Sequence, residues 1–413
     1  MTVDRAGDRA RRVIPGGVNS PVRALKAVGG EPIFMREARG ARIVDVHGNE
    51  YVDWMMSWGP LIAGHAHPEV VEAVQAAAAR GTSFGAPTEA EVELAEVVIG
   101  RIPSAEMVRM TSSGTEASMS AIRLARAATG RDALLKFAGA YHGHVDGLLA
   151  DAGSGLATQG IPASPGVTSA QAADTTVVPW NDREALEHAL RERDYAAILA
   201  EPYPANMGLV PPQEGFLAFL RERADASGAL LVFDEVISGF RVGPGGAQAR
   251  ERVTPDLTIL GKVIGGGLPA AAYAGPRELM ERVAPAGEVY QAGTLSGNPL
   301  ATAAGLATLR LLDTAAYERL EASTEALATG LRALGLAVAS APGLLTGFFA
   351  AEAPSDYESA KACDLDAFAA FWRGMQKRGI YLPPSQFEAW FPSLAHGPRE
   401  IELTLAAASE VLG

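Results

Sequence analysis

Hydrophobic and polar positions follow two different periods along the chain, and the period changes from one segment to the next. Residues 41–56 alternate apolar and polar side chains on both sides of a His-Gly-Asn turn, which predicts a β-hairpin. Apolar positions then recur every three or four residues over 68–81 and 87–102, which predicts two helices. The second helix opens with a capping box formed by Thr88 and Glu91 and ends before a proline.

Short apolar runs alternate with amphipathic helices through the middle of the chain. The predicted strands cover 107–113, 133–139, 196–202, 229–235, 256–262 and 271–275. The predicted helices between them include 114–130, 182–194 and 214–228. Apolar strands separated by helices are typical of a parallel sheet covered on both faces. The pattern therefore predicts an α/β fold built on a mostly parallel sheet.

The length and the later pattern predict more than one domain. A chain of 413 residues exceeds what a single core usually serves, and the pattern turns strongly helical after Asn298. We predict an N-terminal arm and hairpin over 1–60 that pack with the small domain. A large domain then covers 61–300, and a smaller α+β domain covers 301–413.

One segment, 152–174, follows neither period. It is rich in Gly, Ala, Ser and Pro, and loops of this length in compact domains are usually functional lids or disordered. We interpret it as a mobile lid rather than a linker, because strands are predicted on both sides of it.

Composition narrows the possible partners and the compartment. The chain has 35 Lys and Arg against 48 Asp and Glu, and its formal charge of −13 opposes binding to nucleic acid. Cys363 is the only cysteine, which excludes an internal disulfide and a zinc cluster of thiolates. The N-terminus lacks the apolar region of a secretory signal, and no window approaches a membrane span. We expect a cytoplasmic protein without a metal, a membrane or a nucleic acid as partner.

A candidate anion site lies at the junction of a strand and a helix. Ser113, Gly114 and Thr115 supply hydroxyls and backbone N–H groups at the start of the helix, where a phosphate binds readily. A plain capping turn explains the same residues. Walker and dinucleotide fingerprints are both absent from the sequence.

Two charged residues follow predicted strands and are expected at the same edge of the sheet. Asp234 ends an apolar strand, and Lys262 follows 28 residues later, about one strand-turn-strand unit. Asp234 has an alternative explanation as a structural salt bridge, with Arg241 as its partner. The alternative explanation of Lys262 is a lysine at the edge of the sheet whose side chain reaches solvent.

An anion site, a carboxylate and a lysine together suit pyridoxal phosphate (PLP). This cofactor needs a lysine amine for a Schiff base, an acid that keeps the pyridine nitrogen protonated, and a cup for the phosphate. Tyr141, next to His142 and just after a strand, is placed to stack on the ring. The glycines at 265–267 are interpreted as backbone clearance around the cofactor.

Longer motifs resemble one family from about residue 13 to the C-terminus. They are PGGVNSPVRA, SWGPLIAGHAHPEV, GTSFGAPTE, SGTEASMSAIRLAR, YHGHVDGLLADAGSG, FDEVISGFRV, TPDLTILGKVIGGGLPAAAYAG, VYQAGTLSGNPLA and PSQFEA. The chain resembles the glutamate-1-semialdehyde 2,1-aminomutases, which belong to the fold-type I, class III PLP-dependent aminotransferases. The resemblance implies a homodimer that interconverts PLP and its pyridoxamine form (PMP) and makes 5-aminolevulinate, a tetrapyrrole precursor.

The resemblance also implies a role for each matching residue. Lys262 would carry the Schiff base and shuttle protons, and Asp234 would hold the pyridine nitrogen. The remaining cofactor contacts would be Ser113, Gly114, Thr115, Tyr141, His142, Asn206 and, from the second subunit of the dimer, Thr294. The substrate end would consist of Ser20, Arg23, Trp58, Glu388 and, on the lid, Ser154. Glu388 and Tyr141 would also take part in catalysis.

Some residues depart from the family pattern or have a simpler explanation. Ser112 stands where the family usually has Asn, and Trp390, two residues after Glu388, stands where a small residue is common. Trp390 is expected to narrow the substrate entrance or to pack under the lid. Glu201 is interpreted as a strand-end carboxylate near the cofactor and is left out of the catalytic set.

Two other functions use the same core residues. An ω-aminotransferase would act on two separate substrates, and the GGVNSPVRA arm and the lid argue against it. A non-catalytic protein that binds a phosphorylated ligand would use the same sheet edge without a covalent bond to Lys262.

Overall fold

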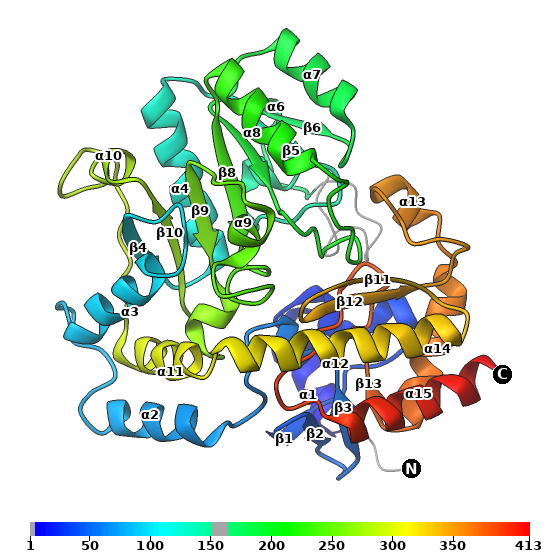
Figure 1. The fold of residues 1–413 in the computed structure, drawn as a ribbon. Helices are drawn as coiled ribbons and strands as arrows, with labels where there is room; N and C mark the ends of the chain where they lie inside the picture. The colour runs from blue at the N-terminus through cyan, green and yellow to red at the C-terminus, as the bar shows by residue number, and fades with distance from the viewer. Residues whose placement is uncertain (1–4, 151–163) are drawn as a thin grey trace.

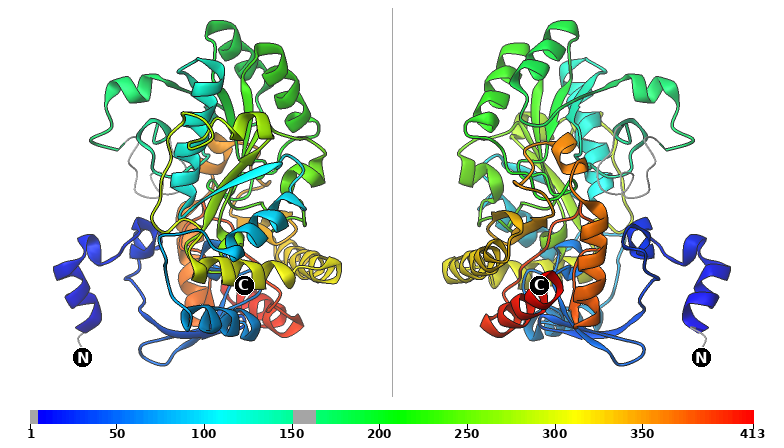
Figure 2. Two further views of the ribbon diagram at one scale, coloured as in Figure 1. Left: turned by 90° about the vertical axis from the view of Figure 1, so that its left-hand side faces the viewer. Right: turned by 90° about the vertical axis from the view of Figure 1, so that its right-hand side faces the viewer.

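The computed structural model describes residues 5–150 and 164–413. Figure 1 shows a central sheet flanked by helices in one part of the molecule, and the N-terminal strands beside the C-terminal helices in the other. The first helix, α1 (Arg5–Val13), projects from the body in the side views of Figure 2. Ser154 and most of the predicted lid lie outside the described residues.

The central sheet has seven strands and is mostly parallel. In spatial order they are β4 (Met107–Thr111), β10 (Ala271–Gly275), β9 (Leu257–Leu260), β8 (Leu230–Glu235), β7 (Ala197–Ala200), β5 (Leu134–Phe137) and β6 (Thr175–Val178). Strands β5 to β9 pair in parallel, which confirms the predicted fold class. The sheet is not parallel throughout, because β10 runs antiparallel to both β4 and β9. Only residues 261–270 join β9 to β10, and a parallel crossover needs about a dozen residues or more.

Helices cover the central sheet on both faces. Helix α4 (Gly114–Thr129) packs across β7 to β10, whereas α7 (Arg183–Glu192) and α8 (Phe216–Ser227) pack against β6 to β8. Alternate residues of β7 accordingly belong to different cores: Leu199 joins the α4 side, and Ile198 the side of α7 and α8. Burial on both faces explains why these strands are continuous apolar runs in the sequence.

A second sheet joins the two ends of the chain. Its strands are β1 (Met35–Arg39), β2 (Arg42–Asp45), β3 (Glu50–Asp53) and β13 (Ile380–Tyr381). Strands β2 and β3 form the predicted hairpin, and β13 pairs in parallel with β3. The sequence pattern did not indicate β1. The predicted division of the chain at residues 60 and 300 stays a prediction.

The remaining elements surround these sheets. The longer helices are α2 (Pro68–Ala78), α3 (Glu89–Ile99), α11 (Pro299–Arg310), α12 (Thr314–Ala333), α14 (Leu365–Lys377) and α15 (Pro398–Leu412). The short helices are α6 (Ser169–Ala173), α9 (Gly246–Glu251), α10 (Arg277–Met280) and α13 (Tyr357–Lys361), and β11 (Ala337–Ala341) pairs with β12 (Leu344–Phe348). The 3₁₀ helices are η1 (Pro15–Gly17), η2 (Pro21–Ala24), η3 (Lys26–Val28), η4 (Met56–Trp58), η5 (Asp146–Leu148) and η6 (Lys262–Gly265). Helix α6 lies inside the segment that the sequence pattern left without structure.

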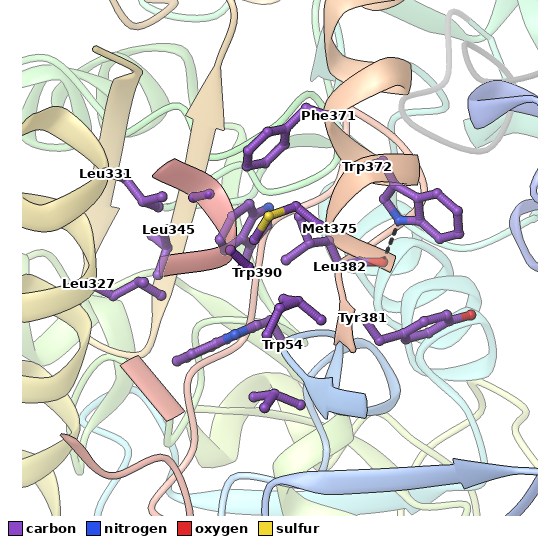
Figure 3. Close-up of a cluster of buried hydrophobic side chains, with 14 of the residues drawn as sticks. Trp54, Leu327, Leu331, Leu345, Phe371, Trp372, Met375, Tyr381, Leu382 and Trp390 are labelled. Atoms are coloured by element: carbon purple, nitrogen blue, oxygen red, sulfur yellow. Dashed lines mark hydrogen bonds between the residues drawn. The ribbon is translucent and has the colours of Figure 1, made fainter. Parts of the chain in front are cut away.

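Trp390 belongs to the core between the second sheet and the C-terminal helices. It is 1% exposed, and Figure 3 shows it among apolar side chains that include Trp54, Leu345 and Met375. Its backbone N–H donates to Leu345 O at 2.7 Å, so the tryptophan is fixed beside β12. The expectation that Trp390 narrows the substrate entrance is therefore wrong, because its ring fills this core and does not line the cavity described below.

Candidate active site

A cavity of about 350 Å³ opens where several strands of the central sheet end. The residues after β4, β5, β7, β8 and β9 line it, because the carboxyl ends of parallel strands meet at one edge. Of the predicted site residues, the cavity is lined by Ser113, Gly114, Thr115, Tyr141, His142, Asn206, Asp234 and Lys262. Its volume lies in the range of small-molecule sites, about 300–1,000 Å³.

Lys262 begins η6 directly after β9 and faces three carboxyl groups. Its backbone has a φ of 47°, a conformation that non-glycine residues seldom adopt. Burial lowers the pKa of its amine, while the charges of Asp234, Glu201 and Glu388 oppose that shift. The amine of this partly buried side chain is thus shifted toward the neutral form, which proton transfer at a carbon atom requires.

Asp234 lies near the end of β8 and pairs with a histidine, not with an arginine. Its Oδ2 lies 2.8 Å from His142 Nδ1, and its Oδ1 accepts from Val236 N at 3.0 Å. The alternative of a salt bridge between Asp234 and Arg241 is wrong, because Arg241 donates to backbone carbonyls elsewhere. Burial lowers the pKa of His142, although the contact with Asp234 opposes the shift. An imidazole that donates from Nδ1 holds the carboxyl group of Asp234 in place.

The start of α4 offers donors for an anion. Ser113 caps the helix and accepts from Glu116 N at 3.3 Å, so the predicted capping turn is present. The first N–H groups of any helix, here those of Gly114 and Thr115, have no carbonyl partner within the helix. Both residues line the cavity, so a capping turn and a candidate anion site coexist at this position.

Gly143 lets the loop after β5 close onto this helix start. Its φ is +82°, and a Cβ at this position would lie 2.6 Å from Thr115 Oγ1. His144, the next residue, has Nδ1 at 3.2 Å from the same hydroxyl. The loop that carries Tyr141 and His142 is therefore packed directly against the anion site.

Glu201 connects two of the predicted cofactor contacts, a role that the sequence interpretation missed. It accepts from Tyr141 N at 2.7 Å and from Asn206 Nδ2 at 2.9 Å. Burial, with the charge of Asp234, raises the pKa of Glu201 to about 8. Its position at the end of β7, the strand beside β8, was the available signal.

Other residues line the cavity without a sequence signal of their own, and they are mostly apolar: Pro60, Val236, Ile237, Leu268, Pro269 and Ala270. Val236 directly follows β8, so the sequence could have placed it at the carboxyl edge of the sheet. Tyr141 and Val236 both contribute to walls of the cavity, which gives it an aromatic and an aliphatic surface.

The glycines after Lys262 have a different purpose from the predicted one. Only Gly267 lines the cavity. A Cβ on Gly266 would lie 2.4 Å from Ala304 O, and one on Gly265 would lie 3.2 Å from Ala270 N. The predicted role of Gly265 and Gly266 in giving backbone clearance around a cofactor is therefore wrong. Gly266 instead lets the backbone approach α11 closely, and Gly265 lets it approach the segment before β10.

The predicted substrate residues lie outside the cavity wall. Ser20, Arg23, Trp58 and Glu388 do not line it, although the charge of Glu388 acts on both Lys262 and Tyr141. Arg23 is exposed, and so is Thr294, which does not reach the cavity of its own chain.

The donor set fits pyridoxal phosphate. Lys262 supplies an amine, Asp234 an acid for a pyridine nitrogen, and the start of α4 a set of N–H donors for a phosphate. His142 Nε2 is buried and has no hydrogen-bond partner among the described residues. This atom can therefore form a hydrogen bond with a ligand in the site.

Family comparison places the chain in a known class. The model of class III aminotransferases matches residues 25–385. The chain therefore belongs to the class III aminotransferase family, whose fold-type I architecture the mostly parallel sheet reproduces.

Particular relatives within this class share a single name. A glutamate-1-semialdehyde 2,1-aminomutase of Roseiflexus castenholzii is 58% identical over 412 residues, covering 98% of this chain and 95% of the relative. The protein of the same name from Thermomicrobium roseum is 54% identical, covering 100% and 99%.

Solved structures of two related activities superpose well. A glutamate-1-semialdehyde aminomutase of Pseudomonas aeruginosa in complex with PMP is 30% identical with a TM-score of 0.87, covering 99% of this chain and 93% of that one. An ω-transaminase from Sphaerobacter thermophilus is 35% identical with a TM-score of 0.91, covering 98% and 96%. The fold alone therefore does not choose between the two reactions.

Proposed function

We propose that this chain is a PLP-dependent aminomutase that converts glutamate 1-semialdehyde into 5-aminolevulinate, a step toward tetrapyrroles and porphyrins. The observation that carries the proposal is the 58% identity, over nearly the whole chain, to an aminomutase of that name. The cavity supports it, because Lys262 and Asp234 line it together.

The cofactor, when bound, supplies an amino-group carrier and an electron sink. The chain supplies the rest. The first turn of α4 would bind the phosphate, Asp234 would hold the pyridine nitrogen protonated, and Tyr141 would lie against the ring. Asn206, which donates to Glu201, would contact the phenolic edge of the ring.

Lys262 moves the protons. Substrate and product are isomers that differ in the carbon that carries the amine, so protons must leave one carbon and return to another. The pKa of Lys262 is lowered by burial, which keeps its amine able to accept a proton. Glu388, whose charge acts on Lys262, would be a second catalytic group that also reaches the substrate end.

The substrate end and the dimer are further parts of the proposal. Ser20, Arg23 and Trp58 would receive the substrate, with the guanidinium of Arg23 on its carboxylate. Ser154 would contribute from the lid over 152–174, which keeps a partly converted substrate from escaping. Thr294 of the partner subunit would complete the phosphate site of a homodimer; the exposure of Thr294 on its own chain supports this arrangement.

The proposed location is the cytoplasm. Over residues 5–150 and 164–413, no helix has both the length and the apolar character to cross a bilayer.

One experiment separates the aminomutase from an ω-aminotransferase. Purified enzyme loaded with cofactor is incubated with glutamate 1-semialdehyde as the only substrate, and 5-aminolevulinate is measured. The aminomutase forms product without any other amine, because the amino group comes from the substrate itself. Product that forms only when a separate amino donor is added would identify the ω-aminotransferase instead.

A further inference from the structure

Arg241 is a fully buried cation whose hydrogen bonds all go to backbone carbonyls. Its Nη1 donates to Gly343 O and Pro392 O, both at 3.0 Å, and its Nη2 donates to Gly59 O. Among the described residues, Nε has no hydrogen-bond partner and no carboxylate forms an ion pair with the guanidinium. Burial lowers the pKa of Arg241 to about 9, so the side chain stays charged at neutral pH. Burying an unpaired charge costs folding free energy. A function of Arg241 would explain why the charge is there.

The three carbonyls belong to segments far apart in the sequence. Gly59 follows η4, Gly343 lies in the turn between β11 and β12, and Pro392 lies in the segment before α15. The guanidinium therefore joins the N-terminal part, the β11–β12 hairpin and the C-terminal part of the chain at one point. Phe391, next to Pro392, also contacts the guanidinium: its ring centroid lies 5.3 Å from Arg241 Cζ.

The Gly59 segment is strained and lies against Lys262. Four successive residues have positive φ: Met56 at 43°, Ser57 at 56°, Trp58 at 68° and Gly59 at 112°. Non-glycine residues in this region cost about 1 kcal/mol or more each, so other contacts must hold the turn. A Cβ on Gly59 would lie 3.3 Å from Lys262 Cδ and 2.9 Å from Phe391 Cε1. The turn that Arg241 holds is thus the wall beside the Lys262 side chain.

Four ionisable groups from different elements act on Lys262. Asp234 of β8, Glu201 after β7 and Glu388 in the C-terminal segment favour the ammonium form, whereas Arg241 favours the neutral amine. Arg241 is the cation that offsets these acids.

We propose that Arg241 is a positioning residue for Lys262: its guanidinium fork holds the strained 56–59 turn and the Pro392 segment against the lysine, and its charge offsets the facing carboxyl groups. The role rests on the proposed function, because it concerns the amine that moves protons. Different substitutions of Arg241 can test the effect of its charge and the effect of its forked donor geometry separately.

Two variants and one control test the proposal. Arg241→Met removes the charge and the donors at similar length, and Arg241→Lys keeps the charge but loses the fork. Arg131→Met is the matched control, since Arg131 Nη1 also donates to two carbonyls, Tyr195 O and Ser227 O at 3.0 Å, away from the cavity. The cofactor-free full chain is labelled with acetic anhydride over a pH series, and acetylation of the Lys262 peptide gives the pKa of that amine.

Arg241→Met is expected to raise the pKa of Lys262 by about half a unit or more, since a nearby cation is lost. Arg241→Lys is expected to leave that pKa near the wild-type value and to raise the KM for glutamate 1-semialdehyde several-fold. Arg131→Met is expected to change thermal stability only. An unchanged Lys262 pKa in Arg241→Met overturns the role of the charge.

If Arg241→Met does not fold, Arg241→Lys decides alone, and wild-type KM and kcat in that variant overturn the role of the fork. A protein that labels as expected but does not isomerise the substrate would contradict the proposed function and leave the labelling result intact.

Discussion

His142 Nδ1 lies 2.8 Å from Asp234 Oδ2, and both side chains are buried. The histidine comes from the loop after β5 and the aspartate from β8, so the contact spans two strand ends. A buried carboxylate with a neutral donor keeps its charge without a cationic partner. The carboxylate of Asp234 is thereby held in place beside the cavity, where a ligand can contact it.

Loss of that charge should stop the reaction but preserve the fold. Asp234→Asn is expected to reduce kcat/KM by about 100-fold or more, equivalent to roughly 2.7 kcal/mol, because the ring nitrogen is no longer held protonated. Steady-state kinetics with glutamate 1-semialdehyde measure the effect. The matched control is Asp256→Asn, which removes a carboxylate bonded to Arg221 and Leu231 N outside the cavity. Equal losses of kcat/KM in the two variants would argue against a special role for Asp234.

The close approach of Gly143 to Thr115 makes cofactor binding sensitive to one methyl group. Gly143→Ala is expected to weaken PLP binding by about 10-fold or more, since the new Cβ displaces the loop from the anion site. Gly335→Ala is the control, because Gly335 has a similar φ of +91° and open space around the position of a Cβ. Titration of the cofactor-free protein with PLP measures both. Similar PLP affinities in the two variants would contradict the predicted effect of the clash between residue 143 and Thr115.

The position of Trp390 predicts a loss of stability without a change of selectivity. Trp390→Ala is expected to lower the free energy of unfolding by about 3–5 kcal/mol, because it leaves a hole in the core shown in Figure 3. The ratio of kcat/KM values for glutamate 1-semialdehyde and for a bulkier amino aldehyde should stay unchanged. A variant that accepts the bulkier compound better, at unchanged stability, would contradict this placement.

Acid should destabilise the protein through His396. Burial lowers the pKa of His396 from 6.5 to about 4, and its ring stacks on Trp54 with centroids 4.0 Å apart. The unfolded chain binds a proton that the folded chain does not, so stability is lost as the pH falls from about 6.5 toward 4. The resulting loss in the free energy of unfolding reaches about 3 kcal/mol.

The pH dependence of urea unfolding measures this loss. His396→Gln is expected to flatten the slope between pH 6.5 and 4. The exposed His188, replaced in the same way, should leave the slope as it is. A slope that His396→Gln does not change would assign the acid sensitivity to other groups.

The sequence pattern was sufficient for the parts of the site that follow from strand ends. Asp234 and Lys262 could be placed together, because parallel strands bring their carboxyl ends to one edge. The direction of β10 was not accessible from apolar runs, since a buried antiparallel strand has the same composition. The length of the β9–β10 connection was the available signal.

Contacts between distant segments could not be predicted from local patterns. The partner of Asp234 turned out to be His142 and not Arg241, because the fold directs Arg241 toward Gly59, Gly343 and Pro392. Trp390 was misjudged for the same reason: its distance in sequence from Glu388 says nothing about which side of the segment it faces.

The most direct measurement is reduction of the cofactor-loaded protein with borohydride, followed by peptide mapping. A Schiff base between PLP and the amine of Lys262 is expected to leave one pyridoxyl group per chain, on the peptide that contains Lys262. A protein that binds the cofactor yet yields no pyridoxyl adduct, or carries the adduct on another lysine, would contradict the assignment of this cavity as the catalytic site.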